Sequence, residues 1–111
     1  MDETHYRLLK LFEGKQDWSQ RELARELGIS LGKVNYCLNA LMEKGLIKAG
    51  NFRNNRNKLV YAYLLTPRAI EEKAVMTVNF IRRKIAEYEA LEKEIAQLKR
   101  DLDGLKSRHP Q

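Results

Sequence analysis

Residues 19–48 read SQRELARELGISLGKVNYCLNALMEKGLIK, and this stretch decides the fold. Its first four residues are typical of a capping box, in which the hydroxyl of Ser19 accepts from the backbone of Glu22 and the glutamate reaches back. Gly28 ends the first helix, and Ser30 caps a second helix after a short turn. The sequence therefore predicts two capped helices joined by a tight, glycine-containing turn.

The segments around this pair complete the domain. A helix is predicted over residues 4–13, and strands are predicted over residues 46–52 and 58–65, where LVYAYL is rich in β-formers. The connection between the strands, RNNRN, is polar, basic and turn-prone. Three helices followed by a hairpin with a charged tip predict a winged helix-turn-helix.

A long helix is predicted at the C-terminal end. The pair Thr66-Pro67 is typical of a helix start, and helical periodicity continues nearly to Ser107. We expect a winged domain over residues 1–66 and a separate C-terminal helix over residues 67–108. The predicted fold class is mainly α with a small β-hairpin wing, plus a long coiled-coil helix.

Positive charge is concentrated in the middle of the chain. The whole protein carries a net charge of +6, and its pI near 9.5 favours a polyanionic partner. The segment from Ser30 to Thr66 contains six basic residues and one acidic residue, Glu43, which gives a net charge of +5. This distribution favours double-stranded DNA as the partner of the helix pair and the wing.

The candidate DNA contacts lie on two elements. A helix fits the major groove, where its first turns reach base edges, and a hairpin tip reaches phosphates or the minor groove. On the second helix of the pair they are Ser30, Lys33, Asn35, Tyr36 and Asn39. On the wing they are Arg53, Asn55, Arg56 and Lys58.

The C-terminal helix carries an apolar seam with heptad spacing. Its members are Val78, Ile81, Ile85, Tyr88, Leu91, Ile95, Leu98, Leu102 and Leu105. The register slips by a three-residue stammer between Tyr88 and Leu91. Flanking g and e positions are opposite in sign when two copies run in parallel (Lys84 with Glu89, Glu94 with Lys99, Asp101 with Lys106). We therefore expect a parallel homodimer that reads a pseudo-palindromic operator.

Other kinds of site lack support in the sequence. The single cysteine, Cys37, falls on the predicted buried face, and His5 and His109 lack the spacing of a zinc site. No nucleophile motif or phosphate loop is present, so we expect no enzyme, no cofactor and no metal. No apolar run approaches the ~18 residues of a membrane span, and no signal peptide is apparent, so we expect a cytoplasmic protein.

Three stretches resemble a known family. SQRELARELGISLGKVNYCLNALMEKGLIK, NFRNNRNKLVYAYLLTPRAIEEK and AEYEALEKEI are similar to the MarR-family regulators associated with exopolysaccharide (EPS) gene clusters. The resemblance implies a bacterial transcriptional regulator of exopolysaccharide biosynthesis genes. Many MarR-like proteins have an additional N-terminal helix that helps to form an effector pocket. Here the first helix begins almost at Met1, and we assign no effector ligand.

Two alternatives to DNA binding remain at this point. The chain is a protein-interaction adaptor if the coiled coil binds a different partner and the winged helix is only a docking module. Binding of RNA is a further reading of the same basic segment. A plain three-helix core with a solvated loop would carry none of these functions.

Overall fold

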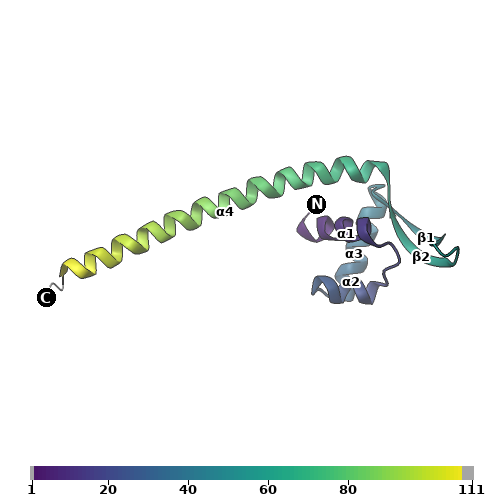
Figure 1. Ribbon diagram of the computed structural model, residues 1–111, viewed down its shortest axis with the longest axis horizontal. Coiled ribbons are helices and arrows are strands. Elements are labelled where there is room, and N and C mark those ends of the chain that lie inside the picture. The colour runs from purple at the N-terminus through teal and green to yellow at the C-terminus, as the bar shows by residue number, and fades with distance from the viewer. Residues whose placement is uncertain (1, 109–111) are drawn as a thin grey trace. The chain divides into compact units, whose positions relative to one another are not determined.

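The structure is a computed structural model that describes residues 2–108 (Figure 1). Within them, four helices and one antiparallel hairpin follow in the predicted order, with bounds within one residue of those predicted. They are α1 (Glu3–Gly14), α2 (Gln20–Leu27), α3 (Leu31–Glu43), β1 (Ile47–Arg53), β2 (Leu59–Leu65) and α4 (Pro67–Arg108). The winged-helix class is confirmed.

The chain falls into two compact units. The first reaches to Thr77 and the second begins at Val78, so that α4 contributes to both. Ala69 and Met76, near the start of α4, are buried. The first turns of this helix therefore belong to the compact unit of the winged domain. The functional boundary expected between residues 66 and 67 stays a prediction.

Local signals in the sequence form the helix-turn-helix. The Ser19 hydroxyl accepts from the amide of Glu22 at 3.0 Å, and the Glu22 carboxylate accepts from the amide of Ser19 at 2.9 Å. Gly28 follows α2 in the left-handed conformation, with φ of 66°, and the amide of Ile29 donates to the carbonyl of Ala24. Because a side chain disfavours this conformation, glycine makes the sharp turn inexpensive.

One apolar core holds the first unit together. Apolar residues on one face of each of α1, α2 and α3 are almost completely buried, as their helical spacing requires. Phe12 of α1 stacks on Tyr63 of β2 with ring centroids 5.2 Å apart, which joins the helices to the hairpin. The largest fully buried side chains are Phe12, Leu8, Leu9, Leu23, Leu38, Leu41, Leu46, Val34 and Cys37.

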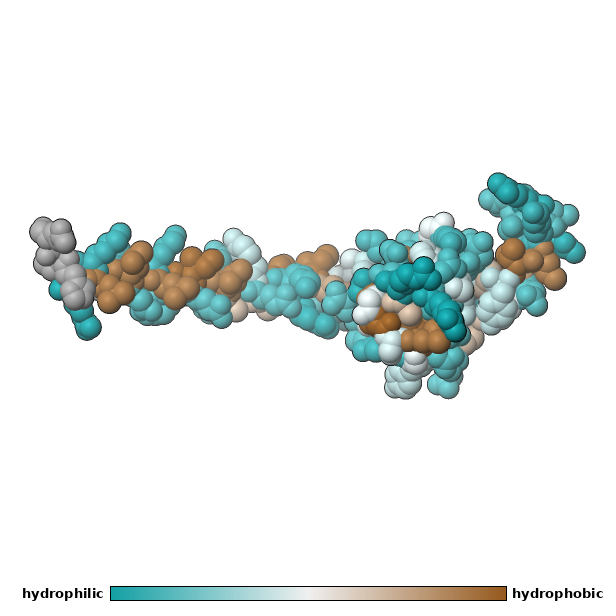
Figure 2. Space-filling view, turned by 90° about the horizontal axis from the view of Figure 1, so that it is seen from below, coloured by the Kyte–Doolittle hydropathy of each residue, from teal (hydrophilic) through white to brown (hydrophobic). Residues whose placement is uncertain are grey.

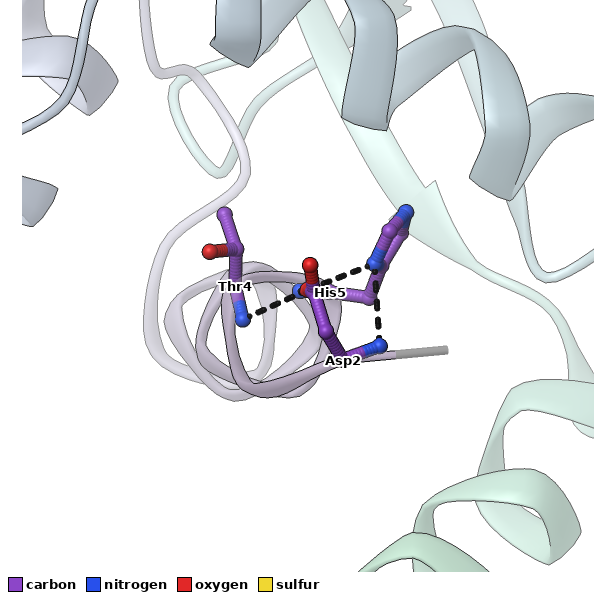
Figure 3. Close-up of polar contacts among 3 residues, drawn as sticks. All are labelled: Asp2, Thr4 and His5. Atoms are coloured by element: carbon purple, nitrogen blue, oxygen red, sulfur yellow. Dashed lines mark hydrogen bonds and ion pairs between the residues drawn. The ribbon is translucent and has the colours of Figure 1, made fainter.

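A polar cap at the start of α1 was not predicted from the sequence (Figure 3). A carboxylate oxygen of Asp2 accepts from the amides of Thr4 at 2.9 Å and His5 at 3.2 Å. The ring of His5 lies back over Asp2, with Nδ1 2.9 Å from the same oxygen. Burial opposes the charge on Asp2, but the bonds to His5 and its charge outweigh burial and lower the pKa of the carboxyl group. These contacts explain why a histidine is buried at this helix end.

Two further bonds connect segments that are distant in sequence. The carbonyl of Gln16 accepts from the amide of Tyr63 at 3.0 Å, so the α1–α2 connection lies along the edge of β2. The hydroxyl of Thr66 donates to the carbonyl of Gly45 at 2.6 Å. Thr66 precedes α4 as predicted, but its hydroxyl bonds to the carbonyls of Gly45 and Leu46, in the connection between α3 and β1.

Candidate nucleic-acid interface

The exposed face of α3 begins at its N-terminus. The hydroxyl of Ser30 accepts from the amide of Lys33 at 3.1 Å, so this predicted contact residue also caps the helix. The side chains of Lys33, Asn35, Tyr36 and Asn39 are exposed, Tyr36 to 71%. The first two turns of α3 therefore present polar and aromatic side chains that a DNA groove accommodates.

The opposite face of α3 anchors it to the core. Val34, Cys37, Leu38 and Leu41 are buried, as their spacing predicts. Burial raises the pKa of the Cys37 thiol, and the charge of Asp2 acts in the same direction, whereas Lys33 opposes both. The neutral, buried thiol is a packing group, because a reactive cysteine needs a lowered pKa and exposure.

The asparagines of α3 are connected to α2. The side-chain amide of Asn39 donates to the side-chain carbonyl of Asn35 at 3.2 Å, and that of Asn35 donates to Gln20 at 3.5 Å. Gln20 is the first residue of α2. Both asparagines are contact residues predicted from the sequence, whereas Gln20 was not predicted. Its position directly after the Ser19 cap was the available signal, since the start of one helix faces the other in this motif.

The tip of the wing is a tight turn built by asparagines. The amide of Asn57 donates to the carbonyl of Asn54 at 2.9 Å, and Asn57 has a positive φ of 60°. The side-chain oxygen of Asn54 accepts from the amides of Arg56 and Lys58. Asparagine tolerates the left-handed region better than most residues, which explains its repetition here. Neither Asn54 nor Asn57 was predicted as a site residue, yet both shape the tip.

The wing cations differ in their engagement. The guanidinium of Arg53 donates to the carbonyl of Asn57 at 3.0 Å and so braces the turn. The exposed side chains of Arg56 and Lys58 make no hydrogen bond or ion pair within residues 2–108. Figure 2 shows the tip as a hydrophilic surface. Both cations are therefore available to an anionic partner.

A groove of about 560 Å³ runs between the wing and the α1–α2 connection. Lys15 lines it opposite the wing cations, and Asp17 contributes a negative charge. Lys15 also lies 4.6 Å from the centre of the Trp18 ring and 3.7 Å from a carboxylate oxygen of Glu22. Lys15 was not predicted from the sequence, because the bond between Gln16 and Tyr63 that brings this segment to the wing joins residues far apart along the chain.

Tyrosines of β2 lie on its core side, near the start of α2. Tyr63 is buried, and burial raises the pKa of its hydroxyl, whereas a hydrogen bond from Gln20 lowers it and Tyr61 raises it further. Tyr61 meets Tyr63 edge to face at 5.6 Å. Tyr63 is therefore a packing residue, whereas Tyr61 is 54% exposed.

The predicted seam of α4 is an exposed apolar stripe in the second compact unit. All nine members are between 45% and 66% exposed in the single chain. Figure 2 shows apolar side chains recurring along the helix. Lys84 pairs with Glu87 of the same helix at 3.4 Å, and Asp101 accepts from Gln97 at 2.9 Å.

The described part of the chain contains neither a cluster of metal ligands nor a membrane-spanning helix. Residues 2–108 contain no group of three or more histidines, cysteines or acids that could hold a metal ion. His109, which was considered for zinc, lies outside the described residues. None of the described helices is long and apolar enough to cross a membrane.

Comparison with known proteins identifies the domain. Residues 1–48 match the family model of winged helix-turn-helix DNA-binding domains. This match covers α1, α2 and α3, which include the helix-turn-helix described above. A search of curated proteins finds no match to the chain.

Solved structures share the fold. BldR, a transcriptional regulator from Sulfolobus solfataricus, superposes with a TM-score of 0.60 at 16% identity, over 98% of this chain and 76% of that chain. A ZitR mutant from Lactococcus lactis in complex with DNA superposes with a TM-score of 0.56 at 21% identity, over 97% of this chain and 75% of that chain. The adhesin competence repressor AdcR from Streptococcus pyogenes superposes with a TM-score of 0.57 at 16% identity, over 97% of this chain and 80% of that chain. The chain therefore has the winged helix-turn-helix fold of these regulators, and its residues 1–48 match the model of winged helix-turn-helix DNA-binding domains.

Proposed function

We propose that this protein is a MarR-type transcriptional regulator that binds double-stranded DNA with sequence preference in the cytoplasm. The observation that carries the proposal is the exposed polar face at the start of α3, on a winged domain whose hairpin tip holds free cations. A ZitR structure with the same fold contains DNA, which supports this use of the fold. The resemblance of the sequence to EPS-associated regulators suggests exopolysaccharide genes as targets.

In the proposed mode of binding, the two elements have different tasks. The first turns of α3 enter the major groove, where Lys33 donates to guanine or phosphate and Asn35 pairs with adenine. The wing places Arg56 and Lys58 against the backbone or in the minor groove. Contacts to phosphate supply affinity for any duplex, and contacts to bases supply preference among sequences.

We further propose that two chains pair in parallel through the nine apolar residues of the α4 seam. In a parallel pair, the g-to-e′ charges on neighbouring helices attract, whereas opposing Glu94 and Asp101 in an antiparallel pair repel. On pairing, Lys84 would exchange its contact with Glu87 of the same helix, and Asp101 its contact with Gln97, for oppositely charged residues of the second chain. Such exposed pairs contribute about 0.3–0.5 kcal/mol each, so they select orientation, and apolar burial provides the stability.

Binding to random duplex at two salt concentrations tests DNA binding. We expect affinity to fall steeply with salt, because bound cations release counterions from the phosphates. Equal competition by double-stranded RNA would favour the RNA reading. An absence of binding to either nucleic acid, with a heterologous partner captured by the α4 helix, would favour the adaptor. Protection mapping upstream of the neighbouring genes tests the exopolysaccharide target.

Replacement of Asn35 by alanine is expected to lower affinity for a selected site by about 1–3 kcal/mol, the value of one bidentate base contact. Affinity for random duplex should change little. Titration of both duplexes measures the difference, and Asn79→Ala, an exposed asparagine on α4, is the matched control. An equal loss on both duplexes would make Asn35 a backbone contact.

Replacement of Arg56 by alanine is expected to weaken binding to all duplexes alike. The slope of log affinity against log salt should flatten by about one unit, because one phosphate contact is lost. Lys93→Ala removes the same charge from an exposed position outside the seam and should leave the slope unchanged. If the slope of Arg56→Ala equals that of the wild type, the wing does not touch phosphate.

A further inference from the structure

A line of polar side chains crosses the winged domain from the hairpin to the exposed face of α3. Gln20 of α2 and Tyr63 of β2 line the same surface hollow. The side-chain oxygen of Gln20 accepts from the amide of Asn35, and the side-chain oxygen of Asn35 accepts from Asn39. Gln20 thus lies next to both the hairpin and Asn35, the side chain proposed to read adenine.

These bonds leave free the groups that a base contact needs. A carboxamide has two N–H donors and an oxygen with two lone pairs. Asn35 uses one donor toward Gln20 and one lone pair toward Asn39. One donor and one lone pair remain, and a bidentate contact with N7 and the N6 amino group of adenine needs one group of each kind. The bonds to Gln20 and Asn39 therefore leave Asn35 with the number of donors and acceptors that a base contact requires.

Gln20 itself has little freedom. It occupies the first position of α2, which the reciprocal Ser19–Glu22 cap holds in place. Its side chain is half-buried, bonded to Asn35 and close to the buried Tyr63. A side chain held in this way imposes an orientation on its exposed neighbour.

We infer that Gln20 is a positioning residue for sequence recognition: it holds the Asn35 carboxamide in the flip state that pairs with adenine. A free carboxamide exchanges its oxygen and nitrogen by a rotation of 180°, and the reversed state presents the donor and acceptor in the wrong order. Holding one state in advance favours the base that matches it. This inference rests on the proposed DNA-binding function and adds the origin of its specificity.

The test uses the full-length protein and duplexes selected by the wild type from a randomised library. The readout is the preference for adenine over other bases at the position where Asn35→Ala loses selectivity. Asn35→Ala should lose that preference by about 5–150-fold, which corresponds to the value of one bidentate contact. Gln20→Ala should lower it by about 3–10-fold, since the contact survives without its orientation. Binding to random duplex should stay within about twofold of the wild type.

Three further variants separate positioning from other roles. In the Asn35→Ala background, Gln20→Ala should have no additional effect, because no carboxamide remains to be oriented. Gln20→Glu keeps an oxygen that accepts from Asn35 and should restore the preference for adenine, while its negative charge weakens binding to every duplex. Glu26→Ala, an exposed change on the same helix, should leave the preference intact.

The outcomes distinguish this inference from the function on which it rests. If the wild type selects no sequence and binds no duplex, the proposed function is wrong. If the wild type selects a site and Gln20→Ala keeps the full preference, only the positioning role is wrong. A uniform loss on all duplexes would make Gln20 a phosphate contact, and additive losses in the double variant would also overturn the inference.

Discussion

Replacement of both Leu98 and Leu102 by glutamine is expected to convert a dimer into a monomer and to lower affinity for a full operator by about 10²–10⁴-fold. Both leucines are at least half exposed in the single chain. Each leucine buried in a dimer contributes about 1.5–3 kcal/mol, and the double substitution removes four of them. The loss in affinity follows because the second winged domain then binds without the tether that raises its local concentration.

Sedimentation at tens of micromolar and titration of full and half operators measure this effect. Lys93→Gln with Arg100→Gln is the matched control, because both positions lie on α4 outside the seam. Truncation after Arg83 should give the same monomer with an intact winged domain, since the first compact unit ends at Thr77. A wild-type monomer, or a dimer that survives both changes, would contradict the proposed pairing through α4.

Replacement of Leu38 by alanine is expected to lower the free energy of unfolding by about 2–5 kcal/mol. Leu38 is 1% exposed and lies on the face of α3 that packs on the core. The substitution leaves a cavity that the surrounding helices fill only in part. Because the exposed face of α3 is positioned by its buried face, the loss of packing also loosens the proposed DNA-reading surface.

Thermal unfolding should show the change as a fall in Tm of about 8–40 °C, since 1 kcal/mol corresponds to about 4–8 °C in a small domain. Leu31→Ala is the matched control, with the same change at a position of the same helix that is 44% exposed. It should cost less than about 1 kcal/mol. Equal effects of the two variants would show that α3 is not held by the packing described here.

Much of the fold could be predicted from short-range patterns. The capping box at Ser19, the turn at Gly28 and the cap at Ser30 each depend on bonds between residues at most five positions apart. Helical spacing also predicted that Val34 and Leu38 are buried. Such signals survive in the sequence because the groups that interact are close along the chain.

Part of the candidate site followed from the same patterns. Lys33, Asn35 and Arg56 are exposed as expected, because each lies opposite a buried stripe or in a turn without apolar residues. The different roles of the wing cations could not be predicted from the sequence. The guanidinium of Arg53 donates to the carbonyl of Asn57 and so stabilises the turn, and only the folded loop shows that Arg53 differs in this way from Arg56.

The sequence by itself determined the order of the elements, the two faces of α3 and the apolar seam of α4, because caps, turns and periodicity act locally. Only the tertiary structure decided that the carbonyl of Gln16 bonds to the amide of Tyr63 at the edge of β2, that Lys15 lines a groove with the wing, and that Gln20 contacts Asn35. These residues are separated by 15 or more positions along the chain, and closing such loops depends on the packing of the whole core.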